Sequence, residues 1–249
     1  MSQSKTEPTV CCVMLTADRP ELAQRAVECF RRQTYSAKRL LIWDNGPCDA
    51  LSQEDDGEDG PVAWVPMMSA HGATIGELRN EAASFWTENP ILLHWDDDDY
   101  SHPNRIAEQV ALLQSSGADC VGYREMLFWQ EKIPGKIGIE PGINQMERPG
   151  EAWLYSNRDP RYCLGTSLCY WRKTWERKPF EATSQGEDER FTTGLKCVGI
   201  STLPGPLMIA RIHAGNTSNA YDPADMWKAS EWKRVPEWDS HARLIMEGK

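Results

Sequence analysis

The sequence predicts an α/β protein with a doubly wound, mostly parallel sheet. In residues 9–122, apolar runs of strand length alternate with segments whose apolar residues recur at helical spacing. Parallel strands need crossover connections, so this alternation favours helices on both faces of one sheet. In folds of this class, ligands bind at the carboxyl ends of the strands.

Capping and turn residues place the helix boundaries. Thr74 and Glu77 have the spacing of a capping box, which predicts a helix from residue 75 to about residue 86. Pro103 is expected to begin another helix, and Gly117 to end it. A further helix is expected over 22–30 and an acidic loop over 47–61, with strands at 9–15, 40–43, 62–65, 91–95 and 120–122.

From about residue 123 the pattern changes to short segments rich in aromatic residues, Gly and Pro. Residues 133–150 show no periodicity and are expected to be mobile or to face the substrate. The remaining pattern predicts strands at 164–171 and 207–212 and helices over 187–195 and 224–234.

Composition limits the classes of function. The formal net charge of -10 disfavours a nucleic acid acceptor. No apolar run approaches the ~20 residues of a membrane span, and the first residues are polar, so we expect a cytoplasmic protein without a membrane anchor. Eight cysteines are scattered without a CxxC pair, which predicts reduced, mostly buried thiols rather than disulfides or a zinc site.

Four consecutive aspartates, Asp96 to Asp99, follow the apolar run at 91–95. Carboxylates this close repel one another, and a bound Mg²⁺ or Mn²⁺ would offset the repulsion. A solvated acidic turn before the next helix is the alternative. Because Thr16 and Asp44 also follow predicted strands, the three positions should meet at one edge of the sheet, which favours a binding site.

Short motifs at the strand ends and on two helices occur in a characteristic order. They are Thr16 with Arg19-Pro20, Asp44-Asn45-Gly46, Gly76-Glu77-Leu78-Arg79-Asn80, Trp95-Asp96-Asp97-Asp98-Asp99 with Pro103, and Gly186-Glu187-Asp188. Taken in this order, the chain resembles the family 2 glycosyltransferases of the GT-A fold over roughly residues 9–215.

The resemblance implies a site for a nucleotide-sugar donor. It assigns the base and ribose to Thr16 and Asp44, and it places Arg79 beside the nucleotide. The donor-binding residues expected from it are Thr16, Arg19, Asp44, Arg79, Asp96 and Asp97. A turn role for Asp44 and a surface ion pair for Arg79 are the structural alternatives.

The resemblance also implies a divalent metal, Mn²⁺ or Mg²⁺. Asp96 and Asp98 match a D-x-D motif, and in an extended segment their side chains would face one ligand while Asp97 points away. Asp98 is the expected direct ligand, joined by Asp96 and by His213 before Gly215. A structural histidine is the alternative for His213.

Glu187 and Asp188 match the acidic pair of inverting members, in which the aspartate is the general base. A sugar hydroxyl has a pKa far above 7, so its attack on an anomeric carbon needs a carboxylate to accept the proton. Acidic residues in the first turn of a helix are also favoured by the helix dipole, which is the structural alternative for this pair.

Other classes fit less well. A haloacid-dehalogenase-type phosphatase carries its D-x-D on the first strand, and a sugar nucleotidyltransferase has a Gly-rich loop there, whereas residues 16–20 contain no glycine. A carbohydrate-binding module would account for eleven tryptophans without a metal site. The absence of GxGxxG and GxxxxGK[ST] argues against dinucleotide oxidoreductases and P-loop enzymes.

We therefore expect a metal-dependent hexosyltransferase that moves a sugar from a nucleotide-diphosphate donor, such as a UDP-sugar, to a hydroxyl of a carbohydrate or other acceptor. The expected organisation is a nucleotide-sugar-binding half over 1–122, an acceptor-binding and catalytic half over 123–215 and a helical tail over 216–249.

Overall fold

The computed structural model describes residues 7–46, 50–57, 60–67, 72–131, 150–201, 207–213 and 231–248. The helices are α1 (Pro20–Arg31), α2 (Ile75–Ala83), α3 (Arg105–Ser116), α4 (Arg172–Arg177), α5 (Glu187–Thr192) and α7 (Asp239–Glu247), with 3₁₀ turns η1 (Ser52–Glu54), η2 (Gly165–Ser167) and η3 (Pro236–Trp238). The strands are β1 (Val10–Thr16), β2 (Lys38–Asp44), β3 (Val62–Pro66), β4 (Ile91–His94), β5 (Tyr100–Ser101), β6 (Cys120–Gln130), β7 (Glu151–Ser156), β8 (Cys169–Trp171), β9 (Cys197–Ser201), β10 (Met208–Ile212) and β11 (Trp232–Arg234).

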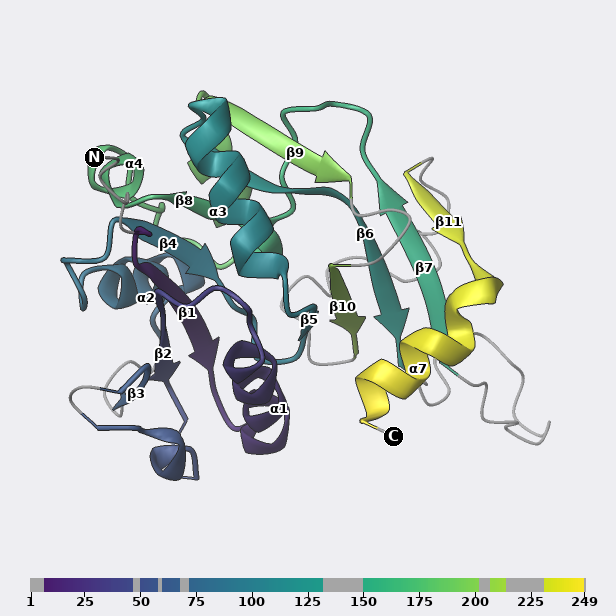
Figure 1. Cartoon of the computed structure of the whole chain (residues 1–249), viewed down its shortest axis with the longest axis horizontal. Coiled ribbons are helices and arrows are strands. Elements are labelled where there is room, and N and C mark those ends of the chain that lie inside the picture. Colours follow the sequence, from purple (N-terminus) through teal and green to yellow (C-terminus); the bar gives the residue numbers. More distant parts are fainter. Residues whose placement is uncertain are drawn as a thin grey trace, which may run out of the picture.

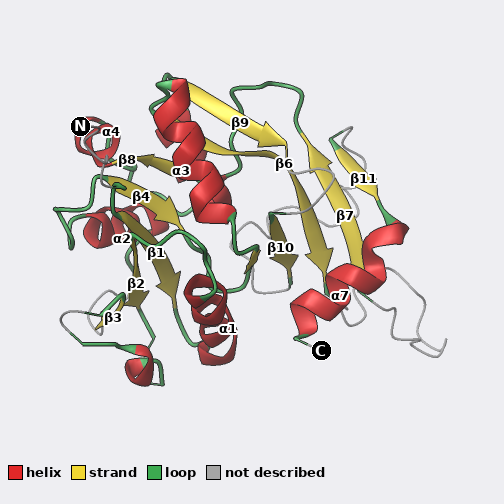
Figure 2. Ribbon diagram, in the orientation of Figure 1, coloured by secondary structure: helices red, strands yellow, loops and turns green. Residues whose placement is uncertain are grey.

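These strands form one curled sheet in the order β11-β7-β6-β8-β4-β1-β2-β3, with β9 and β10 paired to β6 and β5 paired to β10 (Figures 1 and 2). The first four major strands, β1 to β4, pair in parallel, as the sequence predicts. Strand β8 then joins β4 and β6 by antiparallel pairing. The expected α/β class with a mostly parallel sheet is confirmed.

Alternate side chains of the parallel strands enter two separate cores. In β1, Cys12 and Met14 pack with α1 and α3 on one face. Their neighbours Cys11 and Val13 pack with α2 and the aromatic side chains of the α4–α5 region on the other. Both faces are covered, so β1 is apolar from Val10 to Leu15 rather than alternating, and only its last residue, Thr16, is polar.

The G-E-L-R-N motif, residues 76–80, packs α2 against the segment that leads into α5. A Cβ on Gly76 would lie 1.9 Å from the carbonyl oxygen of Glu181, so only glycine permits this approach. The Asn80 side chain donates to the carbonyl of Phe180 at 2.8 Å and accepts from its N–H at 2.9 Å. The predicted capping box of Thr74 and Glu77 is confirmed. Helix α2 therefore positions the chain just before Glu187.

Arg105, the first residue of α3, is fully buried. Its guanidinium donates to the carbonyl of His94 at 2.7 Å, to Ser101 Oγ at 2.8 Å and to the carbonyl of Thr166 at 3.2 Å, while its Nε donates to Gln109 Oε1 at 3.1 Å. One side chain thus joins the end of β4 to β5, α3 and η2. These are the elements on both sides of the aspartate run.

The structure corrects four local predictions. The helix expected from Pro103 begins at Arg105, and the strand expected at 120–122 continues to Gln130. Only Cys169–Trp171 of the strand expected at 164–171 is extended, because residues 165–167 form η2. Of the helix expected over 224–234, residues 224–230 lie outside the described residues and Trp232–Arg234 forms β11, which pairs with β7.

Helix α7 and strands β7, β9 and β11 were not predicted. Strands β7 and β9 pair with β6, and β11 pairs with β7. Helix α7 packs on an apolar core that it shares with β6, β7 and β10, in which Leu127, Ala152, Ile209 and Met246 are buried. The stretch 133–149 expected to be mobile or to face substrate lies outside the described residues.

Two predictions from composition can be compared with the structure. The seven cysteines in the described ranges are all unpaired thiols, and six of them are buried, as expected. Among the described residues, the model contains no helix with the length and apolar character of a membrane span.

The hydrogen bonds of Arg105 lead to a test of stability. We expect Arg105→Met to lower the free energy of unfolding by about 3–5 kcal/mol, because it removes the donor from four buried acceptors. Urea denaturation followed by circular dichroism measures this change. Glu108→Ala, an exposed position on the same helix, is the control, and equal stability of the two variants would contradict the role of Arg105.

Candidate active site

The four aspartates form a turn after β4, and their side chains have different partners. Trp95 anchors the turn: its backbone N–H donates to Val13 at 2.9 Å, and its buried indole Nε1 donates to the carbonyl of Ala26 at 3.0 Å. The chain turns at Asp97 and Asp98, so the strict alternation expected for an extended segment is wrong here. Asp97 and Asp98 instead contact the same guanidinium.

Asp97 is buried against the end of β1. Its carboxylate accepts from Thr16 Oγ1 at 2.7 Å and pairs with Arg19 Nη2 at 3.0 Å. Burial raises the pKa of Asp97 to about 7, and the negative charge of Asp98 adds to this effect, while Arg19 and Thr16 act in the opposite direction. Thr16 therefore meets the aspartate run directly, as its place at a strand end suggests.

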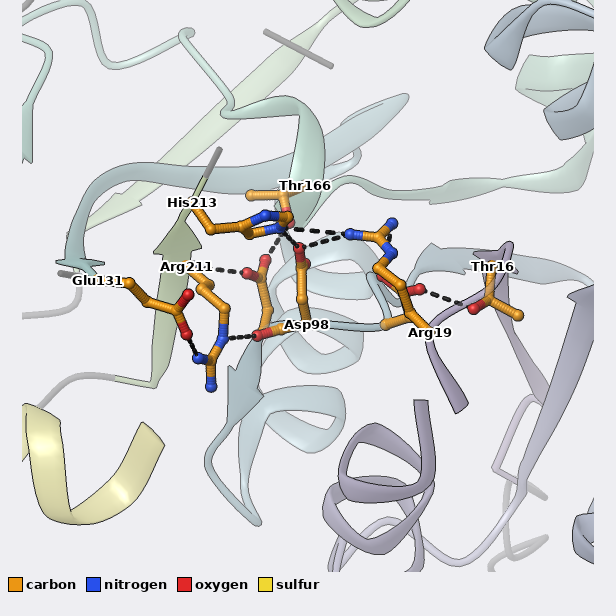
Figure 3. A network of polar contacts seen from close by, with 9 residues as sticks. Thr16, Arg19, Asp98, Glu131, Thr166, Arg211 and His213 are labelled. Atoms are coloured by element: carbon orange, nitrogen blue, oxygen red, sulfur yellow. Dashed lines mark hydrogen bonds and ion pairs between the residues drawn. The ribbon is translucent and has the colours of Figure 1, made fainter. Parts of the chain in front are cut away.

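Asp98 is where two predicted residues meet (Figure 3). Its Oδ2 lies 2.9 Å from His213 Nε2 and 3.1 Å from Arg19 Nη1. Arg19 Nη1 is also 3.4 Å from His213 Nε2, so the three groups form a small triangle. Arg19 comes from the loop after β1 and His213 from the end of β10, 194 residues later in the chain. Only the fold brings them together.

Asp99 is enclosed by groups that the sequence did not indicate. It accepts from Thr166 Oγ1 at 2.6 Å and from the backbone N–H of Arg211 at 2.9 Å. Burial, with the repulsion of Asp98 and Asp96, raises the pKa of Asp99 well above its usual range. The Arg211 side chain also donates to the carbonyl of Asp98 at 3.2 Å and to that of Met246 in α7 at 2.7 Å. Asp99 is thus a structural link between β4, η2 and β10.

Asp96 and Glu187 lie on either side of Arg79. Burial raises the pKa of Asp96, and the charge of Arg79 opposes this. Burial also raises the pKa of Glu187, and the charge of Arg79 again opposes this. Arg79 Nε is 3.6 Å from Glu187 Oε1, with both side chains nearly buried. The Arg79 pair is therefore internal and connects the D-x-D region with the Glu187-Asp188 pair, unlike the surface ion pair considered above.

Asp188 stands at the start of α5, beside η2. A Cβ at Gly165 would lie 1.6 Å from Asp188 Oδ2, so glycine at this position leaves room for the carboxylate. Its other oxygen accepts from the N–H of Glu189 at 2.8 Å. Thr166, which follows Gly165 in η2, donates to Asp99. Asp188 and the aspartate run therefore contact neighbouring residues of η2, Gly165 and Thr166.

Asp44 forms a turn at the end of β2, next to Thr16 in the register of the sheet. One carboxylate oxygen accepts from the N–H of Gly46 at 2.9 Å and the other from Trp64 Nε1 at 3.0 Å. The contacts of Asp44 in this structure are therefore those of a turn residue. These bonds also fix the orientation of the buried carboxylate at the strand edge.

Asp98 and His213 have the geometry of two neighbouring metal ligands. Adjacent ligands of an octahedral ion with bonds of about 2.1 Å lie about 3.0 Å apart, and Oδ2 and Nε2 are separated by 2.9 Å. The carboxylate oxygen of Asp98 is a ligand type that suits Mn²⁺ and Mg²⁺. Within the described ranges no group of three acidic, histidine or cysteine side chains is arranged to hold an ion, and Asp96 as a further ligand stays a prediction. Phosphate oxygens and water commonly complete such partial sites.

The sequence matches no protein-family model and no curated protein. Solved structures match through their architecture. Staphylococcus aureus TarS 1–349 in complex with UDP-GlcNAc superposes with a TM-score of 0.62 at 14% identity, covering 96% of this chain and 70% of TarS. Against TarS 1–349 alone, the TM-score is 0.59 at 14% identity, and the match covers 82% of this chain and 60% of that protein's length. The chain has the GT-A fold.

Two other GT-A structures also match this chain. The mannosyltransferase PcManGT from Pyrobaculum calidifontis, in complex with GDP-Man and Mn²⁺, has a TM-score of 0.57 at 13% identity, with 97% of this chain and 70% of PcManGT covered. GalNAc-T7 with UDP, GalNAc and Mn²⁺ has a TM-score of 0.60 at 12% identity, with 84% and 45% covered. At these identities the GT-A likeness is one of fold.

The buried carboxyl groups predict a pH-dependent stability. A carboxyl group with a higher pKa in the folded protein binds more protons when folded. The free energy of unfolding is therefore greatest below the unfolded value near 4 and falls as the pH rises through about 7 for Asp97. With EDTA present, we expect the wild type to lose about 1–4 kcal/mol between pH 4 and pH 8.

Urea denaturation across this range measures the loss. Asp97→Asn keeps the size of the side chain and removes its titration, so this variant should lose less. Glu81→Gln changes an exposed acid on α2 and should behave as the wild type. An identical pH profile for all three proteins would contradict the effect of burial on Asp97.

Proposed function

We propose that the protein is a glycosyltransferase of the family 2 type that transfers a hexose from a UDP-sugar to an acceptor hydroxyl with inversion, using Mn²⁺ or Mg²⁺. The observation that carries the proposal is the convergence around η2. Asp98 contacts His213 and Arg19, and Asp99 of the same aspartate run accepts from Thr166 in η2. Asp188 of α5 packs against Gly165 in the same turn.

The position of this convergence supports a donor site. It lies at the carboxyl ends of β1 and β4, where ligands bind in open α/β sheets. Thr16 and Asp44 stand side by side at the ends of β1 and β2. The solved GT-A relatives in complex with UDP-GlcNAc, GDP-Man or UDP support a nucleotide sugar as the donor class.

In the proposed reaction Asp44 orients the base or ribose, and the guanidinium groups of Arg19 and Arg79 provide positive charge for the diphosphate. Asp98 and His213 would hold the metal ion, which supplies charge neutralisation for the departing diphosphate when bound. Arg79 balances the buried Glu187 beside the catalytic residue.

Asp188 acts as the general base. The acceptor oxygen attacks the anomeric carbon as its proton passes to Asp188 Oδ2, and the bond from that carbon to the diphosphate oxygen breaks. The N–H of Glu189 holds the second oxygen of Asp188, which fixes the orientation of the carboxylate. A single displacement of this kind inverts the anomeric centre.

The metal assignment can be tested by calorimetry of UDP binding in the presence of Mn²⁺. We expect Asp98→Ala and the addition of EDTA each to weaken binding by at least about 100-fold, because even an outer partner of a metal ligand contributes 10–100-fold to metal affinity. His213→Ala should weaken it by more than about tenfold.

Asp159→Ala removes an exposed acid that pairs with Arg161 and is the control for charge. UDP binding that is the same with Mn²⁺ and with EDTA would contradict a metal-dependent site. A protein that binds carbohydrate but no nucleotide would be a carbohydrate-binding module instead.

The catalytic assignment can be tested with Asp188→Asn, which keeps size and removes basicity. UDP-sugar binding should be retained, and transfer should fall by the ~10²- to 10⁴-fold typical of a lost general base. Glu189→Gln alters the neighbouring exposed acid and should leave the rate within a few-fold. NMR of the product should show a β linkage from an α-linked donor, and retention of configuration would overturn the mechanism.

A further inference from the structure

The position of Arg19 has a consequence for metal binding. Its Nη1 lies 3.1 Å from Asp98 Oδ2 and 3.4 Å from His213 Nε2, and its Nη2 lies 3.0 Å from Asp97 Oδ1 (Figure 3). One guanidinium therefore contacts both groups of the proposed metal pair. It also balances the charge of two adjacent carboxylates, whose side chains are only 2% and 11% exposed.

This arrangement is incompatible with a metal ion bound to the same pair. Nη1 lies at about the distance from Oδ2 and Nε2 that a third adjacent ligand of an octahedral ion would have, about 3.0 Å. A guanidinium has five N–H donors and no lone pair for a metal, and it carries the same sign of charge as the ion. A divalent cation that Asp98 and His213 hold on the side of Nη1 would therefore displace this group.

The Arg19 side chain has room to leave this contact. It belongs to the loop between β1 and α1, just before Pro20, and its side chain is 35% exposed. The side chains that it contacts are the more buried partners, so the guanidinium is the group that can turn toward solvent. The donor diphosphate is the nearest negative charge expected there, since the proposed metal would bind it at the same pair.

We propose that Arg19 is an internal counter-cation that holds Asp97, Asp98 and His213 until a divalent metal replaces it, and that the displaced guanidinium then pairs with the diphosphate of the donor. The inference rests on the proposed function for the identity of the diphosphate. Metal alone then binds weakly, because it must break the contacts of Arg19. Metal and nucleotide strengthen each other, because the diphosphate gives the displaced arginine a new partner.

Calorimetric titration of the metal-free protein with MnCl₂ tests the competition. We expect Arg19→Gln to bind Mn²⁺ at least about fivefold more tightly than the wild type, the lower end of the usual range for coupled sites. The factor by which Mn²⁺ improves UDP affinity should be smaller in the variant than in the wild type. Arg31→Gln removes a surface arginine that pairs with Glu54 and Asp56, and should match the wild type in both measurements.

Chemical modification of the wild type tests the displacement without a variant. Peptide mass spectrometry after brief treatment with phenylglyoxal reports the reactivity of each arginine. Modification of Arg19 should be slow in the metal-free protein, faster with Mn²⁺ alone and slow again with Mn²⁺ and UDP. Arg31 in the same digest serves as the internal reference.

The results separate the two proposals. If Mn²⁺ and UDP bind together but Arg19→Gln binds Mn²⁺ no more tightly and Arg19 reactivity is unchanged by Mn²⁺, the counter-cation role is overturned and the proposed function stands. If the wild type binds no UDP in the presence of Mn²⁺, the proposed function itself is contradicted. Tighter Mn²⁺ binding by Arg19→Gln together with the three-step change in reactivity supports displacement.

Discussion

Burying carboxylates where β4 ends is the constraint on which the rest of the structure depends. Burial raises the pKa of Asp96, Asp97 and Asp99, which means that their charged forms are destabilised by the loss of water. Such a site persists only if donors and positive charge surround it. The neighbouring elements supply these, and their arrangement around the turn follows from that requirement.

Arginines from different parts of the chain meet this requirement in different ways. Arg105 is fully buried and donates to two backbone carbonyls and two side-chain oxygens, so it fixes the elements around the turn. Arg211 donates to the carbonyl of Asp98 through its side chain and to the carboxylate of Asp99 through its backbone N–H, which holds the turn against β10 and α7. Arg19 differs from both because its side chain is 35% exposed and its guanidinium contacts the carboxylates of the aspartate run themselves, which is the arrangement expected of a group that a ligand can replace.

Close backbone approaches make this packing possible. Gly165 leaves space for Asp188 against η2, and Gly76 lets α2 touch the segment before α5. Asn80 then locks that segment by paired hydrogen bonds to Phe180. A G-E-L-R-N motif that looks like an ordinary helix start in sequence thus connects α2 with the acidic pair at α5.

The sequence by itself determined the α/β class, the first strands and helices, and the individual residues of the candidate site, because apolar periodicity, caps and strand-end motifs are local. It did not determine that Asp97 turns toward Arg19, since a turn replaced the expected extended segment.

Only the tertiary structure decided which side chains meet: Thr166 with Asp99, Arg79 with Glu187, and Arg19 with His213. It also decided that β7 pairs with β6 and that β11 pairs with β7 in place of part of an expected helix. The physical reason is the same in each case. These contacts join residues far apart in the chain, and their free energy comes from shared burial and charge balance, which no local pattern records.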